Sequence, residues 1–196
     1  MAYMMDFLRK VGDVFLDFTE TLVIGLSIFL VVYLFFVQPH QVNGQSMVPN
    51  FQNGEYVLTN KFGYRIGEPK RGDVVVFHAP PAAHCPKGTG CDFIKRVIAL
   101  PGETLEVKNC HFYINGRQLP EPYIPDDFCT EPGDFTRNGP VVMGTNEYFV
   151  SGDNRPYSSD SRAWGPVTPN EIVGKVFFVY WPFDAAGVLE HPQYPF

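Results

Sequence analysis

Charged residues are scarce in this sequence: they make up 18% of its 196 residues, whereas hydrophobic residues make up 45%. The sequence also lacks internal repeats and low-complexity tracts. This balance excludes a disordered chain and a membrane protein with several spans. Because 21 acidic residues outnumber 15 Lys and Arg, giving a net charge of −6, the chain lacks the basic surface that binds nucleic-acid phosphates. We therefore expect one well-buried domain with an appendage and no nucleic-acid partner.

Long helical patterns are missing from most of the chain, which contains 18 Gly and 18 Pro and therefore many turns. Short runs rich in β-branched and aromatic residues instead predict strands. These runs are residues 55–59, 73–77, 93–100, 104–107, 111–114, 147–150 and 172–180. Asn115-Gly116 is a strong hairpin signal. We predict a mainly β fold, an antiparallel sandwich or barrel-like domain over residues 39–196, with residues 117–145 as a loop or insertion.

One long apolar run is present, and it lies near the N-terminus. Residues 21–37 carry no charge and show no polar stripe. Their length is at the short end of what a helix needs to cross a bilayer. A cleavable signal sequence is the alternative, but the preceding residues 1–20 are acidic and no small-x-small site follows. We predict a membrane anchor at residues 21–38, so the lipid bilayer is an expected partner. The basic residues on its two sides do not decide its orientation.

The four cysteines, Cys85, Cys91, Cys110 and Cys129, all follow the predicted anchor. An even number is typical of disulfides formed outside the cytoplasm. Three connectivities are possible, and we favour Cys85–Cys91 with Cys110–Cys129. A metal site with His78 and His84, or unpaired structural thiols, are the alternatives, although the spacing matches no tight zinc pattern. We therefore predict no metal and no cofactor.

Two segments contain candidate catalytic residues. Ser46 lies in a turn, Gly44-Gln-Ser-Met-Val-Pro49, which could present its hydroxyl from a rigid loop, although serine is also a common turn residue. Lys95 lies within the apolar run 93–100. If its side chain points inward, desolvation lowers the lysine pKa towards the range of a general base. If it points outward, as strand alternation permits, it is an ordinary surface lysine.

Two further segments look structural. Gly72-Asp-Val-Val-Val-Phe77 is a turn that leads into a buried strand. The segment from Gly152 to Gly165 combines Asp, Asn, Arg, Ser and Trp at a density typical of a packed polar network. None of the five histidines lies in any of the four segments, which argues against a Ser-His-Asp triad.

These four segments, in this order behind an apolar N-terminal run, resemble the motifs of the bacterial type I signal peptidases over roughly residues 20–180. The resemblance implies a serine endopeptidase in which Ser46 is the nucleophile and Lys95 the general base. It further implies that the Ser158 hydroxyl orients the lysine. It also implies two supporting ion pairs, Asp160 with Arg162 and Asp153 with Arg96.

The resemblance also implies an oxyanion hole and substrate pockets. The Ser46 N–H would be one oxyanion donor. The second donor is open, because Gly44 stands where some members of the family have a serine. Val42, Met47, Phe93 and Ile94 would line shallow pockets for the small residues of an extended substrate.

The implied substrates are secretory precursor proteins, cut after small-x-small sites. The implied location is the bacterial inner membrane, with a single span, a monomeric chain and a catalytic domain on the extracytoplasmic (periplasmic) side. A specialised maturation protease of the same clan and an inactive anchored binding module are the alternatives, and the self-cleaving repressors share the Ser/Lys pair. Nothing in the sequence is basic or helical enough for the DNA-binding domain of such a repressor.

Overall fold

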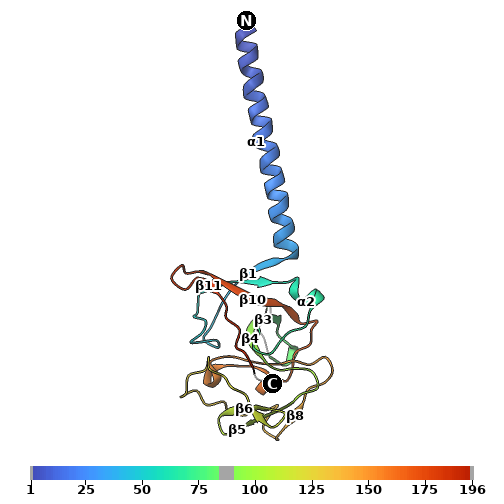
Figure 1. Cartoon of the computed structure of the whole chain (residues 1–196), viewed down its shortest axis with the longest axis vertical. Helices are drawn as coiled ribbons and strands as arrows, with labels where there is room; N and C mark the ends of the chain where they lie inside the picture. The colour runs from blue at the N-terminus through green and yellow to red at the C-terminus, as the bar shows by residue number, and fades with distance from the viewer. Residues whose placement is uncertain (1, 84–90, 195–196) are drawn as a thin grey trace. The chain divides into compact units, whose positions relative to one another are not determined.

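The computed structural model describes residues 2–83 and 91–194. The chain divides into two compact units, Met1–Val37 and Gln38–Phe196. The first unit is a single helix, α1 (Ala2–Phe35), seen in blue in Figure 1. At 1.5 Å per residue its 34 residues span about 51 Å, which exceeds the roughly 30 Å of a bilayer's hydrocarbon core.

The helix therefore begins far before the apolar run that the sequence indicates. Residues 2–20 continue the same helix despite their charges, because they contain no Pro and only one Gly to interrupt it. The stretch Tyr3–Phe35 is long and apolar enough to cross a membrane. The crossing itself, and the division at residues 20 and 38, remain predictions.

The second unit is built on a seven-stranded sheet (Figure 1). Six strands follow the order β1-β2-β10-β3-β4-β9, and β11 also pairs with β10. The strands are β1 (Val37–Gln41), β2 (Tyr56–Asn60), β3 (Val74–His78), β4 (Asp92–Ala99), β9 (Phe149–Ser151), β10 (Ile172–Trp181) and β11 (Gly187–Val188). The pairs that join β2, β3, β4, β9, β10 and β11 are all antiparallel.

A smaller sheet has the order β7-β6-β5-β8. Its strands are β5 (Thr104–Lys108), β6 (His111–Ile114), β7 (Arg117–Gln118) and β8 (Val141–Val142). Asn115 and Gly116 form the turn between β6 and β7 and have positive φ of 51° and 79°, the conformation for which Asn-Gly is favoured. The predicted hairpin and the mainly antiparallel β fold are confirmed.

Short helices connect the strands. They are α2 (Gly63–Ile66), the 3₁₀ turn η1 (Pro81–Ala83), the 3₁₀ turn η2 (Arg155–Tyr157) and α3 (Ser161–Trp164). Asp160 caps α3, because its side chain accepts a hydrogen bond from the Arg162 N–H.

The predicted loop 117–145 is irregular apart from the two short strands β7 and β8. Its middle is tied to the end of the β5–β6 hairpin by a disulfide between Cys110 and Cys129, whose Cα atoms are 4.4 Å apart. This confirms one of the two predicted disulfides. Cys85, the predicted partner of Cys91, lies outside the described residues, so that pair remains a prediction.

Candidate active site

Ser46 is held in a tightly bonded turn that follows β1. The Val42 N–H donates to the Glu55 carbonyl oxygen at 2.7 Å, and the Gly44 N–H donates to Asn53 Oδ1, also at 2.7 Å. Gly44 has a φ of +100°, which a side chain would strain. These contacts fix the path of the chain into Ser46.

Lys95 approaches Ser46 from β4, pairing across the sheet with Val75 of β3. The residue is only 4% exposed, so the side chain points inward and the surface alternative does not hold. Lys95 Nζ lies 2.7 Å from Ser46 Oγ and 3.0 Å from the Ile94 carbonyl oxygen. Residues 49 positions apart therefore form a direct hydrogen bond.

The surroundings of Lys95 favour its neutral amine. Burial lowers its pKa from 10.5 to about 8, because desolvation penalises the ammonium more than the nearby Asp160 and Asp153 carboxylates stabilise it. The ring of Phe93 lies 5.2 Å from the nitrogen and forms part of this environment. Close to neutral pH a useful fraction of the amine is thus able to accept a proton.

Ser158 lies close to Ser46, on the other side of Gly152. A Cβ on Gly152 would come within 2.3 Å of Ser158 Oγ and 2.4 Å of the Ser46 carbonyl oxygen, so only glycine fits between them. Ser158 Oγ is buried and makes no hydrogen bond of standard geometry among residues 2–83 and 91–194, although it lies close enough to Asp160 to help lower the pKa of that carboxyl. Its expected contact with Lys95 remains a prediction.

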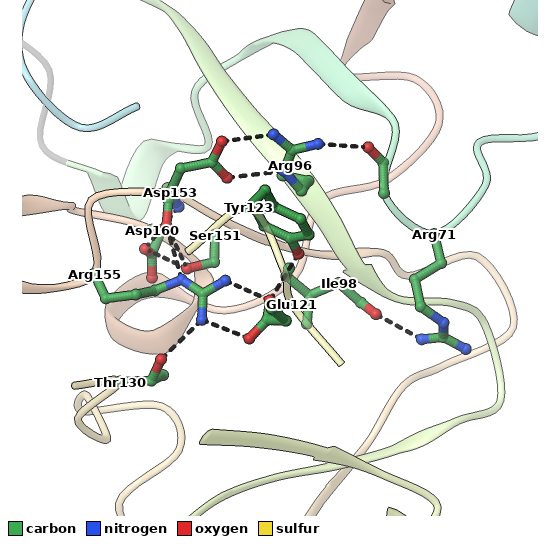
Figure 2. A network of polar contacts seen from close by, with 12 residues as sticks. Arg71, Arg96, Ile98, Glu121, Tyr123, Thr130, Ser151, Asp153, Arg155 and Asp160 are labelled. Carbon is green, nitrogen blue, oxygen red and sulfur yellow. Dashed lines mark hydrogen bonds and ion pairs between the residues drawn. The ribbon is translucent and has the colours of Figure 1, made fainter. Parts of the chain in front are cut away.

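The structure brings Arg96 and Asp153 together in a buried, bidentate ion pair (Figure 2). Arg96 Nε and Nη2 donate to the two carboxylate oxygens at 2.8 and 2.6 Å, and Nη1 donates to the Gly72 carbonyl oxygen at 3.0 Å. Asp153 is fully buried. This pair joins β4, next to Lys95, to the segment that follows β9.

Asp160 and Arg162 also form a buried pair, with Arg162 Nε 2.8 Å from Asp160 Oδ1. Asp160 Oδ2 additionally accepts from Ser151 Oγ at 2.9 Å and from the Gly152 N–H at 3.0 Å. These contacts and the paired Arg162 hold the pKa of Asp160 below its usual range, although burial alone would raise it. The carboxylate therefore stays ionised and fixes the backbone on which Ser158 lies.

Gly44, the position at which the second oxyanion donor was left open, already uses its N–H to bind Asn53 Oδ1. It can serve a substrate only if Asn53 moves. Asn154 contributes to the same region in a way the sequence did not indicate. Its N–H donates to the Ser46 carbonyl oxygen and its Nδ2 to the Gln45 carbonyl oxygen, each at 2.9 Å.

A cavity of about 260 Å³ opens beside the Ser46–Lys95 pair. Val42, Phe93 and Ile94, three of the four predicted pocket residues, line it. Met47 does not: its side chain is 1% exposed and packs in a hydrophobic cluster with Val42 and its neighbours. The turn after Ser46 directs this side chain into the core, and the role of Met47 in a substrate pocket stays a prediction.

Strand β4 offers a free edge along this cavity. β9 pairs with β4 only from Arg96 to Ala99, so within the described chain no strand pairs with the outer edge of residues 92–95. An extended peptide could add there by backbone hydrogen bonds.

Several residues of the site carry no signal in the sequence. Arg155, whose side chain is 0% exposed, forms a two-point ion pair with Glu121 and donates to Thr130 Oγ1 at 2.8 Å (Figure 2). His40 and Asp92 line the cavity, and Asp92 Oδ1 lies 2.6 Å from His78 Nδ1. The many polar residues around Arg155 predicted a polar network in its segment, but no feature of the sequence near Glu121 predicted a role for that residue.

Metal ligands do not gather in the described part of the chain, except for Cys110, Cys129 and Glu131. The two sulfur atoms of this group are bonded to each other, so they are not available as thiolate ligands. The alternative metal site with His84 and Cys85 involves positions outside the described residues.

A family model described as "Signal peptidase, peptidase S26" matches residues 15–181. Signal peptidase IB of Staphylococcus aureus is 36% identical over 181 residues, covering 86% of this chain and 91% of the relative. Signal peptidase I S of Bacillus subtilis is 38% identical over 178 residues, covering 86% and 90%.

A crystal structure of a signal peptidase I from Enterococcus faecalis is 32% identical in sequence. It covers 56% of this chain and 97% of its own, with a TM-score of 0.45.

Proposed function

We propose that this chain, which belongs to the signal peptidase family (peptidase S26), cuts secretory precursors after small-x-small sites by Ser46–Lys95 catalysis. Membership of the family makes it a serine endopeptidase that removes signal peptides from secreted proteins. The observation that carries the finer proposal is the 2.7 Å contact between Ser46 Oγ and the buried Lys95 Nζ.

The reaction follows from the two groups. The neutral Lys95 amine takes the proton of the Ser46 hydroxyl as the oxygen bonds to the carbonyl carbon of the residue before the cut. The Ser46 N–H is the proposed donor to the resulting oxyanion. The lysine then gives its proton to the leaving amine as the carbon–nitrogen bond breaks. Water, deprotonated by the same amine, releases the acyl group and restores Ser46.

Substrate selection fits the cavity. An extended precursor would pair with the free edge of β4, and residues before the cut would place side chains against Val42, Phe93 and Ile94. A cavity of about 260 Å³ shared by several side chains admits small ones more readily than large ones.

The helix α1 supports membrane anchoring, since Tyr3–Phe35 is long and apolar enough to span a bilayer. We propose a single span in the bacterial inner membrane, a monomer, and a second unit on the extracytoplasmic side. The Cys110–Cys129 disulfide supports that side, because such bonds persist in oxidising compartments.

The test is cleavage of a secretory precursor by the purified full chain in detergent, with the cut mapped by mass spectrometry. We expect a cut after a small-x-small site that is lost in Ser46→Ala and in Lys95→Ala. Lys108→Ala, on the exposed part of β5, is the matched lysine control and should retain full activity. Cleavage that survives in Ser46→Ala would refute the assignment of the nucleophile. A wild type that cuts a single dedicated precursor would instead indicate a specialised maturation protease.

A further inference from the structure

The segment Glu121–Tyr123 lies outside the four motifs, yet it contacts all three chain segments that build the site. The first contact is with the segment that follows β9. Glu121 binds the buried Arg155 guanidinium at two points, one of them 2.9 Å between Nη1 and Oε2. Arg155 Nε in turn donates to the Gly152 carbonyl oxygen at 3.0 Å, and Gly152 lies against the Ser46 carbonyl. Glu121 therefore fixes, through Arg155, the turn that packs on the nucleophile's backbone; Figure 2 shows the contact between Glu121 and Arg155.

The second contact is with β4. The Tyr123 ring covers the guanidinium of Arg96, with 4.1 Å between Arg96 Cζ and the ring centroid. Arg96 follows Lys95 directly in sequence and pairs with Asp153. The Tyr123 hydroxyl donates to Glu121 Oε1 at 2.7 Å, so the two side chains hold each other in place. Figure 2 shows both of them between the two arginines.

The third contact is with the turn of Ser46. Asn50 Nδ2 donates both to the Tyr123 carbonyl oxygen and to Asp153 Oδ2, each at 2.9 Å. The loop that contains Glu121 and Tyr123 is also tied to the β5–β6 hairpin. Cys129 is bonded to Cys110, and its neighbour Thr130 donates its N–H to the Cys110 carbonyl oxygen at 3.1 Å and accepts from Arg155.

We infer that Glu121 and Tyr123 are positioning residues for the Ser46–Lys95 pair: they hold Arg155 and Arg96, and the disulfide-tied loop exists to supply them. The inference rests on the proposed function. It assigns residues 117–131 a role in setting the geometry of catalysis rather than in choosing substrates. Because an error of about 1 Å in the geometry of a catalytic pair can cost about 100-fold in rate, the effect should be seen in kcat.

The experiment measures kcat and KM of the full chain in detergent on one precursor. Glu121→Gln keeps the shape and removes the charge, and we expect kcat to fall about 10-fold or more with KM and the cut position unchanged. Glu121→Asp, which keeps the charge, should recover part of the loss. Tyr123→Phe keeps the ring on Arg96, so its kcat should fall less than the kcat of Tyr123→Leu.

Two comparisons distinguish positioning of the catalytic pair from a contribution of Glu121 to stability alone. Ile114→Ala truncates a fully buried residue of the smaller sheet and should lower Tm without lowering kcat. A double-mutant cycle with Arg155→Lys should be non-additive, with Glu121→Gln costing less than about threefold in that background.

Three results would overturn the inference: a change in KM or in the cut position, a kcat within twofold of wild type, or a fall in kcat in Ile114→Ala as large as that in Glu121→Gln. If Glu121→Gln does not fold, Glu121→Asp and Tyr123→Leu answer the same question. A wild type that cuts no precursor would count against the proposed function instead, before any variant is compared.

Discussion

The two sheets of the second unit bury different kinds of side chain. The smaller sheet and its neighbours enclose an apolar cluster of Ile98, Ala99, Leu105, Val107, Phe112, Ile114, Leu119, Met143 and Phe149. The larger sheet buries two apolar clusters of its own, but it differs from the smaller sheet in also burying charged side chains around β4 and the segment that follows β9. Lys95, Arg96, Asp153, Arg155, Asp160 and Arg162 are each at most 6% exposed.

This difference shows how the chain divides stability and function. Apolar burial contributes roughly 25 cal/mol per Å² and tolerates small changes of shape. Buried charges contribute little net stability, because desolvation offsets most of their attraction. The charged side chains serve the geometry of the site: they hold a buried lysine amine against a serine hydroxyl at the wall of the cavity. The following experiments test that division.

The largest effect on folding is expected from Asp153→Asn. This change leaves Arg96 buried without its ionised partner, and breaking a buried pair in this way costs about 3–5 kcal/mol. Urea unfolding followed by the fluorescence of Trp164 and Trp181 would measure it. Glu106→Gln is the matched control, since its pair with Lys108 is partly exposed and worth less than about 1 kcal/mol. Equal losses in both variants would remove the distinction between the two regions.

Lys95→Met should abolish cleavage and at the same time stabilise the fold. Burial lowers the pKa of Lys95 from 10.5 to about 8, so below pH 8 the folded chain must bury an ammonium, at a cost of up to about 3 kcal/mol. Between pH 8 and 10.5 the unfolded state binds more protons than the folded state, so wild-type stability rises with pH. The advantage of Lys95→Met should be largest at pH 7 and fade towards pH 10.5. Unfolding curves at both pH values would check this, and a variant less stable than wild type at pH 7 would contradict it.

The same pKa sets the pH dependence of the rate. Only the neutral amine accepts the Ser46 proton, and half of Lys95 is neutral near pH 8 but only about 1% at pH 6. We expect kcat/KM for a short peptide substrate to fall about 50-fold between pH 8 and pH 6. A flat profile over this range would show that another group is the base. Circular dichroism at pH 6 serves as the control for folding.

The smallest effect is expected in the apolar region. Ile114→Val removes one methylene group from a fully buried position and should cost about 0.5–1.5 kcal/mol. Because Ile114 contributes nothing to the charged network, kcat should stay at the wild-type value. Parallel measurements of Tm and kcat would sharpen the comparison, and a fall in kcat would show that the two regions are coupled.

Most strands could be predicted from sequence because their residues carry the signal locally. The runs at 73–77 and 172–180 correspond to β3 and β10, and the Asn115-Gly116 turn was confirmed by its φ angles. β1 was not predicted because its sequence, Val-Gln-Pro-His-Gln, does not alternate apolar and polar residues and contains only one β-branched residue. β7, β8 and β11 have two residues each, too few for any pattern.

Within the site, only residues that lie in a motif of the family could be predicted. The sequence by itself favoured a Lys95 side chain that points outward, and the resemblance to a family, not periodicity, paired it with Ser46. Glu121 and Tyr123 could not be found, because their partners lie 34 and 27 residues away in sequence and a loop has no period that would bring them together. The burial of Met47 could not be predicted either, because a motif gives the neighbours of a residue without the direction of its side chain.

The free edge of β4 at residues 92–95 also has a consequence for timing. A strand edge can pair only with a segment that is still extended. In a folded segment the backbone N–H and C=O groups already form hydrogen bonds within that segment's own structure. Under the proposed binding of the precursor at this edge, cleavage competes with the folding of the secreted protein. A precursor whose mature part folds slowly near its start should be cleaved completely. A precursor whose mature part folds fast, up to the cleavage site, should remain uncleaved.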